Sequence, residues 1–122
     1  MPEVTKIPPA PRGSGPHGRA LWRAVQREFE LSEHEAVLLA RACRVSDVCA
    51  DLQAVVDSEG PLVTTRLGEQ RTHPALVELR AQGMLLARLI VALRVPLGDD
   101  DAESSRPQRR GIRGVYGLRG VS

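Results

Sequence analysis

Apolar residues recur at helical spacing early in the chain and predict a short amphipathic helix over residues 18–30. Three large apolar side chains share one face, and three arginines recur every fourth residue on another. The apolar face consists of Trp22, Val25 and Phe29, and the basic face of Arg19, Arg23 and Arg27. Residues 1–16 hold five prolines and two glycines instead, which predicts a disordered arm.

A second, long helix is predicted over residues 33–59. Ser32 and Glu35 form a capping box, in which the serine oxygen accepts a free amide and the glutamate reaches back to the serine amide. Gly60 followed by Pro61 ends the helix. Its apolar positions alternate by four and three, as in a heptad seam, at Leu38, Ala42, Val45, Cys49, Leu52 and Val56.

The segment after this helix is typical of a small β-hairpin. Residues 62–66 favour a strand, Leu67 and Gly68 supply a turn, and residues 69–72 can return as a second strand. Because an isolated two-stranded hairpin is marginally stable, we expect it to lean on the helices or on a neighbouring subunit.

Pro74 fits the first position of a third helix, which ends before Pro96 and Gly98. Its seam residues alternate by three and four at Leu76, Leu79, Gly83, Leu86, Ile90 and Leu93. Further apolar residues lie off the seam at Leu85, Leu89, Val91 and Ala92, and Arg88 is the one charge between Met84 and Leu93. The helix is therefore apolar on nearly every side, and a single partner helix cannot cover all of this surface.

This excess of apolar surface predicts self-association, because a three-helix chain of this size cannot easily enclose it. We expect the interface between copies to be formed by Leu76, Leu79, Leu85, Leu86, Leu89, Ile90 and Leu93.

The predicted fold is mainly α: a short first helix, a long antiparallel helical hairpin, and a small β-hairpin between the second and third helices. Three segments follow from this pattern. Residues 1–16 are expected to form the proline-rich arm, residues 17–97 a helical domain for oligomerisation and, from the charges described next, DNA contact, and residues 98–122 an acidic linker and a basic arginine/glycine tail. A chain of 122 residues has room for one small domain.

Charge is unevenly distributed, although the net charge is only +2. The tail arginines have no acidic neighbours after Glu103, which favours a nucleic acid or an acidic protein surface as partner. The tail arginines are Arg106, Arg109, Arg110, Arg113 and Arg119. The arginines of the first helix are spaced to meet successive DNA phosphates, and the alternative is a solvated face with ion pairs to nearby glutamates.

The chemistry of an enzyme is not visible in the sequence. His17, His34 and His73 form no metal-ligand spacing with one another or with a cysteine, and no phosphate-binding glycine loop is present. We therefore expect no catalytic residues, no metal and no cofactor. Cys43 and Cys49 are expected to be reduced, and no stretch is long and apolar enough for a membrane, so we expect a soluble intracellular protein.

The order of these features resembles the small subunit of the terminase of tailed bacteriophages. The resemblance rests on the Trp-bearing first helix, Glu59-Gly60, the hairpin around Gly68, the run His73-Pro74-Ala75-Leu76, and the ending from Arg106 to Gly120, which is similar to that of phages and prophages of high-GC actinobacteria. It implies a non-catalytic packaging protein in the cytoplasm of the bacterial host. Such a protein assembles into a ring, binds double-stranded viral DNA and recruits the large subunit, which holds the ATPase and nuclease.

Two other functions remain open from the residues alone. The chain could be a small oligomeric DNA-binding regulator unrelated to packaging. It could also be an interaction scaffold whose tail docks on an acidic protein.

Overall fold

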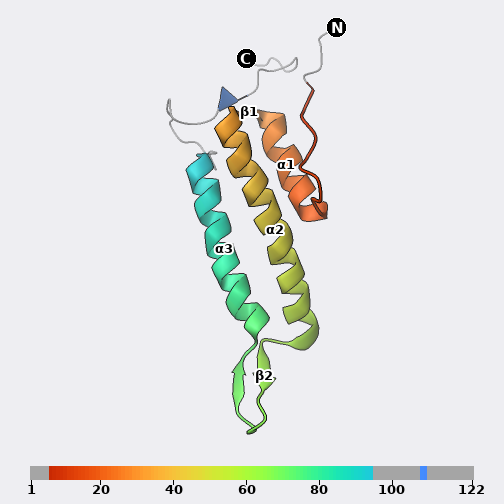
Figure 1. Ribbon diagram of the computed structural model, residues 1–122, viewed down its shortest axis with the longest axis vertical. Coiled ribbons are helices and arrows are strands. Elements are labelled where there is room, and N and C mark those ends of the chain that lie inside the picture. Colours follow the sequence, from red (N-terminus) through yellow and green to blue (C-terminus); the bar gives the residue numbers. More distant parts are fainter. Residues whose placement is uncertain (1–5, 95–107, 110–122) are drawn as a thin grey trace, which may run out of the picture.

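The computed structural model describes residues 6–94 and 108–109, which form three helices and four short strands. The elements in chain order are α1 (Pro16–Glu28), β1 (Phe29–Glu30), α2 (Glu33–Glu59), β2 (Leu62–Thr64), β3 (Gln70–Thr72), α3 (Pro74–Leu93) and β4 (Gln108–Arg109). α2 and α3 lie side by side as a long antiparallel hairpin, and α1 covers one end of it (Figure 1). The mainly helical fold predicted from the sequence is confirmed.

The bounds of α2 are those predicted, because both ends are set by local chemistry. The amide of Glu35 donates to Ser32 Oγ at 3.3 Å, and the amide of Ser32 donates to Glu35 Oε1 at 2.7 Å. At the other end Gly60 has a φ of 89°, and its amide donates to the carbonyl of Val56 at 2.7 Å. A positive φ is tolerated best by glycine, so the helix stops there.

α1 begins at Pro16, two residues earlier than predicted, and its cap comes from a different helix. Gly15 is the N-cap residue and has no side chain to offer. The carboxylate of Asp47, on α2, instead accepts the amide of Gly15 at 2.7 Å and that of Gly18 at 2.8 Å. A contact 29 residues away in sequence leaves no local signal, which is why the pattern did not reveal it.

The arm preceding α1 departs from the expectation of disorder over residues 6–15. These residues form neither helix nor strand, as the prolines require, but they fold back along α1. The indole Nε1 of Trp22 donates to the carbonyl of Pro8 at 2.8 Å, and Ala10 packs against the core. Proline prevents regular structure, but it does not prevent an extended segment from packing once a partner surface exists.

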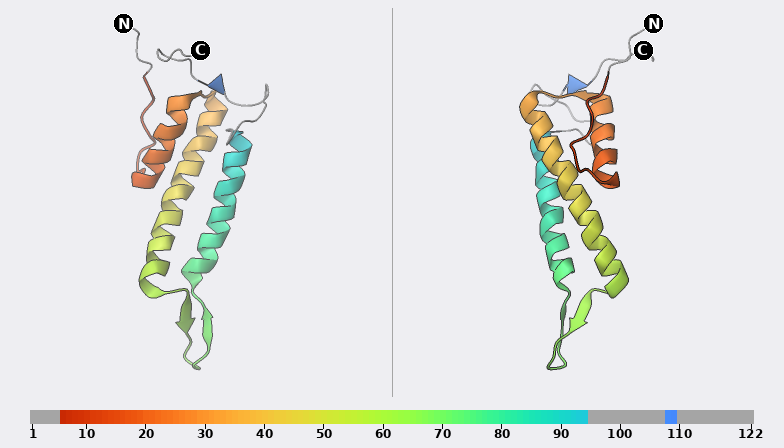
Figure 2. Two further views of the ribbon diagram at one scale, coloured as in Figure 1. Left: turned by 180° about the vertical axis from the view of Figure 1, so that it is seen from behind. Right: turned by 45° about the vertical axis from the view of Figure 1, so that its right-hand side comes forward.

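The core lies at the end of the hairpin that α1 covers. Trp22, Val25 and Phe29 of the first helix and its following strand meet Leu39 and Cys43 of α2 and Leu93 of α3. Among the described residues, no residue of α2 after Val45 and no residue of α3 before Leu93 is buried. Figure 2 shows that α2 and α3 continue beyond α1 as a pair of helices with no third layer. More than half of the hairpin therefore lacks a fully buried side chain.

β2 and β3 form the predicted hairpin at the far end of α2 and α3. Leu62 pairs with Thr72 and Thr64 with Gln70, and Gly68 turns the chain with a φ of 86°. Each strand is shorter than predicted, and its residues are exposed or half-buried. The hairpin projects away from the helices and leans on none of them along its length (Figure 2).

A second, shorter pairing joins β1 to β4, with Phe29 opposite Arg109 and Glu30 opposite Gln108. Within the described residues, this is the point at which the basic tail region contacts the helical body. The other residues of the predicted acidic linker and tail, from Gly98 onward, lie outside the described residues.

Candidate nucleic-acid interface and self-association face

The three arginines of α1 line one hollow of about 330 Å³, which we call the arginine groove. Residues 7–10 of the arm form its other wall, and Trp22 contributes to its lining. The predicted basic face is thus present: Arg19, Arg23 and Arg27 lie together, as their fourfold spacing indicated. The arm converts that face from a flat helix surface into a groove, which the sequence pattern did not foresee.

The charge of the arginine groove is not neutralised within the described part of the chain. No carboxylate of residues 6–94 forms an ion pair with Arg19, Arg23 or Arg27. Arg19 Nη1 donates to the carbonyl oxygen of Ser14 at 2.5 Å, which orients the guanidinium and leaves its charge in place. The alternative of ion pairs between these arginines and nearby glutamates is therefore not found in residues 6–94.

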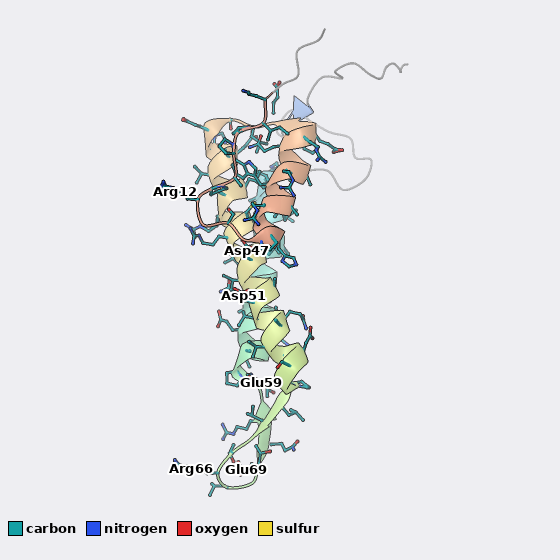
Figure 3. All side chains as sticks on the ribbon, turned by 90° about the vertical axis from the view of Figure 1, so that its right-hand side faces the viewer. Arg12, Asp47, Asp51, Glu59, Arg66 and Glu69 are labelled. Carbon is teal, nitrogen blue, oxygen red and sulfur yellow. The ribbon has the colours of Figure 1, made fainter. Side chains whose placement is uncertain are left out.

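A second basic cluster, which sequence reasoning missed, lies beside the next stretch of the arm, residues 11–14. Arg12, Arg41 and Arg44 line a hollow of about 340 Å³ together with Asp47 and Asp51. Figure 3 shows Arg12 on the arm beside the stretch of α2 that carries the two aspartates. Arg41 and Arg44 are spaced to share a face of α2, but Arg12 joins them only because the arm folds back. This hollow is less positive than the arginine groove, because two carboxylates line it.

Asp47 is held in its charged form by the N-terminus of α1. Desolvation acts to raise the pKa of its carboxyl group, but hydrogen bonds from the amides of Gly18 and Gly15, with the amide and charge of His17, outweigh it. The net pKa lies below the ordinary value of 3.8. The carboxylate therefore anchors the arm and α1 to α2.

The two cysteines match the expectation of free thiols. Burial, with a smaller contribution from the charge of Asp47, raises the pKa of the Cys43 thiol to about 11. Burial also raises the pKa of Cys49. The thiolate is the reactive form, so burial makes Cys43 less reactive, and its side chain packs in the core.

Of the five tail arginines proposed as DNA contacts, one lies among the described residues. Arg109 is described as part of β4, and its backbone pairs with Phe29. The other four, Arg106, Arg110, Arg113 and Arg119, lie outside the described residues.

The predicted self-association residues divide into two groups. Leu93 is 1 % exposed and belongs to the core of the single chain, so it is not available to a second copy and the prediction is wrong for it. The other six are half-buried, because the neighbouring α2 covers them only in part. These six are Leu76, Leu79, Leu85, Leu86, Leu89 and Ile90.

Five of the exposed apolar residues of α2 and α3 recur at heptad spacing, and we call the two sets the outer stripes. On α3, Val77, Met84 and Val91 are 52, 60 and 73 % exposed. On α2, Val48 and Val55 are 37 and 36 % exposed. A spacing of seven places each set on one side of its helix. Of these residues, the sequence pattern singles out only Val91, as an apolar residue off the seam.

The run His73-Pro74-Ala75-Leu76 has a structural role in joining the two long helices. His73 Nδ1 accepts the amide of Ala75 at 2.9 Å and so caps α3. Because Nδ1 is the acceptor, Nε2 carries the hydrogen, and it lies 2.7 Å from Glu59 Oε1 in the last turn of α2. The amide of His73 also donates to the carbonyl of Pro61 at 2.7 Å. These contacts fix the point from which β2 and β3 project.

The described residues contain neither a metal-binding cluster nor a membrane-spanning helix. In the part of the chain that is described, no three His, Cys, Asp or Glu side chains gather as a metal site would require. None of the helices described has the length and apolar character needed to cross a bilayer.

Comparison with known proteins adds no identification. No family model matches the sequence, and no match was found among curated proteins or solved structures.

Proposed function

We propose that this chain is a self-assembling, non-catalytic DNA adaptor of the terminase small-subunit type. In this proposal several copies associate side by side through their helical hairpins, in a ring. The assembly binds double-stranded viral DNA and recruits the terminase large subunit, which supplies the ATPase and nuclease activities. The proposal combines the resemblance in the sequence with two features of the fold.

The observation that carries self-assembly is the uncovered half of the α2–α3 hairpin. Two helices alone leave apolar side chains exposed on each of them, here the outer stripes. Burying one valine or methionine side chain contributes about 1.5–3 kcal/mol, so covering both stripes would stabilise an assembly substantially. A stripe on each helix lets one copy present α3 to the α2 of the next copy. Such a head-to-tail contact closes into a ring when the rotation between neighbouring copies adds up to a full turn.

The arginine groove supports DNA binding. Three guanidiniums without carboxylate partners in residues 6–94 sit on a rigid helix, and each can contact a phosphate oxygen. Trp22 is 6 % exposed and bonded to Pro8, so it is not free to stack on a base. The described contacts therefore suit the DNA backbone, which is read by charge and shape, better than a specific sequence.

Native mass spectrometry of the full chain tests self-assembly. We expect one discrete oligomer for the natural sequence and dissociation for the double variant Met84→Glu and Val91→Glu, because both side chains are already exposed in the single chain. Leu67→Glu is the matched control: Leu67 is 85 % exposed at the tip of the β-hairpin, away from the outer stripes. A monomeric natural sequence at micromolar concentration would overturn the proposal.

The packaging role has a separate test. The cognate terminase large subunit should co-purify with this chain, and its ATPase rate should rise when the chain and DNA are added. An oligomer that binds DNA but leaves that ATPase rate unchanged would point to a DNA-binding regulator instead.

A further inference from the structure

We propose that α2 of one copy faces α3 of the next copy in a single register, and that Asp51 forms an ion pair with Arg80 across this interface. The inference rests on the proposed self-assembly and names the surfaces and the charges that direct it. Asp51 and Arg80 are both exposed, and within residues 6–94 neither forms an ion pair. Each can therefore meet a charge on a second copy.

Contacts at both ends of the hairpin show which residues of α2 and α3 lie at the same level. At the junction of the two helices, His73 Nε2 lies 2.7 Å from Glu59 Oε1. At the other end, Leu39 and Leu93 belong to the same core cluster. Leu39 lies 20 residues before Glu59, and Leu93 lies equally far after His73. Because both helices rise about 1.5 Å per residue, residues equally far from the junction are level with each other.

The residues of the outer stripes fall on common levels. Val55 and Val77 are each four residues from the junction. Val48 and Met84 are each eleven residues from it. In a ring whose axis runs along the hairpins, a rotation changes no height, so these pairs are also level between neighbouring copies. Two apolar layers, Val55 with Val77 and Val48 with Met84, therefore match without any shift of one copy past the other.

The same geometry places Asp51 and Arg80 on one side of the interface. α2 and α3 run in opposite directions within a copy, and so also between copies related by such a rotation (Figure 1). Antiparallel helices that face each other carry equivalent positions on the same side. Asp51 is three residues after Val48, and Arg80 is three residues after Val77. The two charges therefore flank the apolar layers together, at levels that differ by one residue, or about 1.5 Å.

The other nearby residues do not oppose this arrangement. Between the two layers, the opposite side of the interface carries Leu52 and Ala81, four residues after the first residue of each stripe. Arg44 and Arg88 are level as well, but Arg44 lies four residues before a stripe residue and Arg88 four residues after one. A step of four residues turns a helix by about 40° beyond a full turn, so the two arginines lie on opposite sides and do not meet.

The ion pair would decide which helices meet. A symmetric contact of α3 with the α3 of a second copy would bury the same apolar side chains, but it would end at a dimer and leave Arg80 without Asp51. The contact of α2 with α3 leaves one outer stripe uncovered at each end, so that further copies can add. Charges of this kind select among contacts more than they strengthen them.

The first test reverses the charges, because removing one partner of an exposed ion pair has only a small effect. At about 50 mM salt, Asp51→Arg and Arg80→Asp should each raise the dissociation constant of the assembly about tenfold. The double variant should return to within about twofold of the natural sequence, because the pair is restored with its charges exchanged. Sedimentation velocity over a concentration series measures all four chains, and the effects should shrink at about 500 mM salt.

Asp57→Arg and Arg66→Asp are the matched controls, with the same changes of charge. Asp57 is two residues after Val55, about 200° around α2, so it points away from the stripe. Arg66 lies at the tip of the β-hairpin. Both controls should leave assembly unchanged. If the natural chain assembles but the double variant is no better than the single ones, or if the controls weaken assembly equally, the inference is wrong and self-assembly stands.

Cysteine cross-linking tests the pairing of the helices directly. A chain with Val55→Cys and Val77→Cys, and with Cys49→Ser to remove the less buried natural thiol, should give covalent species beyond the dimer on mild oxidation. Val55→Cys with Val91→Cys is the control and should not, because these levels differ by 14 residues, or about 21 Å. Cross-linking that ends at the dimer would overturn the inference. A natural chain that stays monomeric would overturn the proposed self-assembly together with it.

Discussion

The carboxylate of Asp47, in the middle of α2, accepts the backbone amide of Gly18 at 2.8 Å and so caps a different helix. The approach is close because Gly18 has no side chain. A Cβ atom there would collide with the Asp47 carboxylate and lie 2.8 Å from the carbonyl oxygen of Cys43. One glycine and one aspartate thus set the distance between α1 and α2.

Gly18→Ala should destabilise the protein, although alanine is the better helix former by about 1 kcal/mol. The new methyl group meets a backbone carbonyl that cannot move without shifting α2. Gly83→Ala is the matched control, because a Cβ at Gly83 meets nothing within 4 Å. We expect that change to stabilise α3 by up to about 1 kcal/mol. Urea denaturation of both variants checks that the free energy of unfolding falls for Gly18→Ala and rises for Gly83→Ala. A rise for Gly18→Ala would show that α1 does not approach α2 so closely.

Asp47→Ala should lower the free energy of unfolding by about 1–2 kcal/mol, the usual effect of losing a helix cap. Asp51→Ala, four residues further along α2 and exposed, should have little effect. Thermal denaturation distinguishes the two. Equal effects of the two substitutions would mean that the cap does not contribute to stability.

The stability contributed by Asp47 should depend on pH in the acid range. Its pKa is lower in the folded protein than the ordinary value of 3.8, so folding favours the charged form. This contribution is complete above the ordinary value and is lost as the pH falls through the lower, folded value. Asp47→Asn should therefore flatten the fall in stability below about pH 4. Denaturation curves at several pH values test this, and an unchanged slope would contradict it.

His73→Ala should destabilise the junction of the two long helices by about 1–2 kcal/mol, because it removes the cap of α3 and the contact with Glu59. His73→Asn should recover part of this, since asparagine is a good N-cap residue. His34→Ala, at an exposed histidine in the first turn of α2, is the control. If His73→Asn were no better than His73→Ala, the role of His73 as a cap would be wrong.

Replacing Arg19, Arg23 and Arg27 with alanine should reduce the salt dependence of DNA binding. Removing one arginine–phosphate interaction lowers the slope of log K against log salt by about 0.9, so the full effect is up to about 3. Arg66, Arg71 and Arg80 replaced together are the control, with the same change in net charge at positions away from the groove. Equal slopes for the two triple variants would place the DNA contact elsewhere.

Cys43 should resist alkylation until the protein unfolds, because burial excludes the reagent and raises the pKa of the thiol to about 11. Cys49 is only half-buried and should react first. Mass spectrometry after brief treatment with iodoacetamide at about pH 8, with and without urea, measures both sites. Rapid labelling of Cys43 in the folded protein would mean that the core beneath α1 opens readily.

The sequence alone was a good guide where the structure depends on neighbours in the chain. The capping box at Ser32 and the glycine at residue 60 fix α2 to the residue, because the bonds that start and stop the helix span only a few positions. The fourfold spacing of Arg19, Arg23 and Arg27 likewise predicted a common face. What the spacing could not give was the second wall of the groove.

The residues that sequence reasoning missed all depend on contacts between distant segments. Arg12 joins Arg41 and Arg44 because the arm folds back, and the arm is anchored in part by Pro8 accepting from Trp22. The apolar pattern of α3 showed too much apolar surface but not which part faces outward. Leu93 was assigned to an interface between copies, and it lies in the core because α1 covers that end of the hairpin.

The sequence by itself determined the three helices, the hairpin between the second and third, and the excess of apolar surface on α3. Periodicity and caps are properties of short stretches, and they can be read from the order of residues. Only the tertiary structure decided where α1 and the arm lie, and with them the groove, the buried end of α3 and the exposed outer stripes. The reason is that a side chain is buried or exposed according to what packs against it, and here that partner comes from far along the chain.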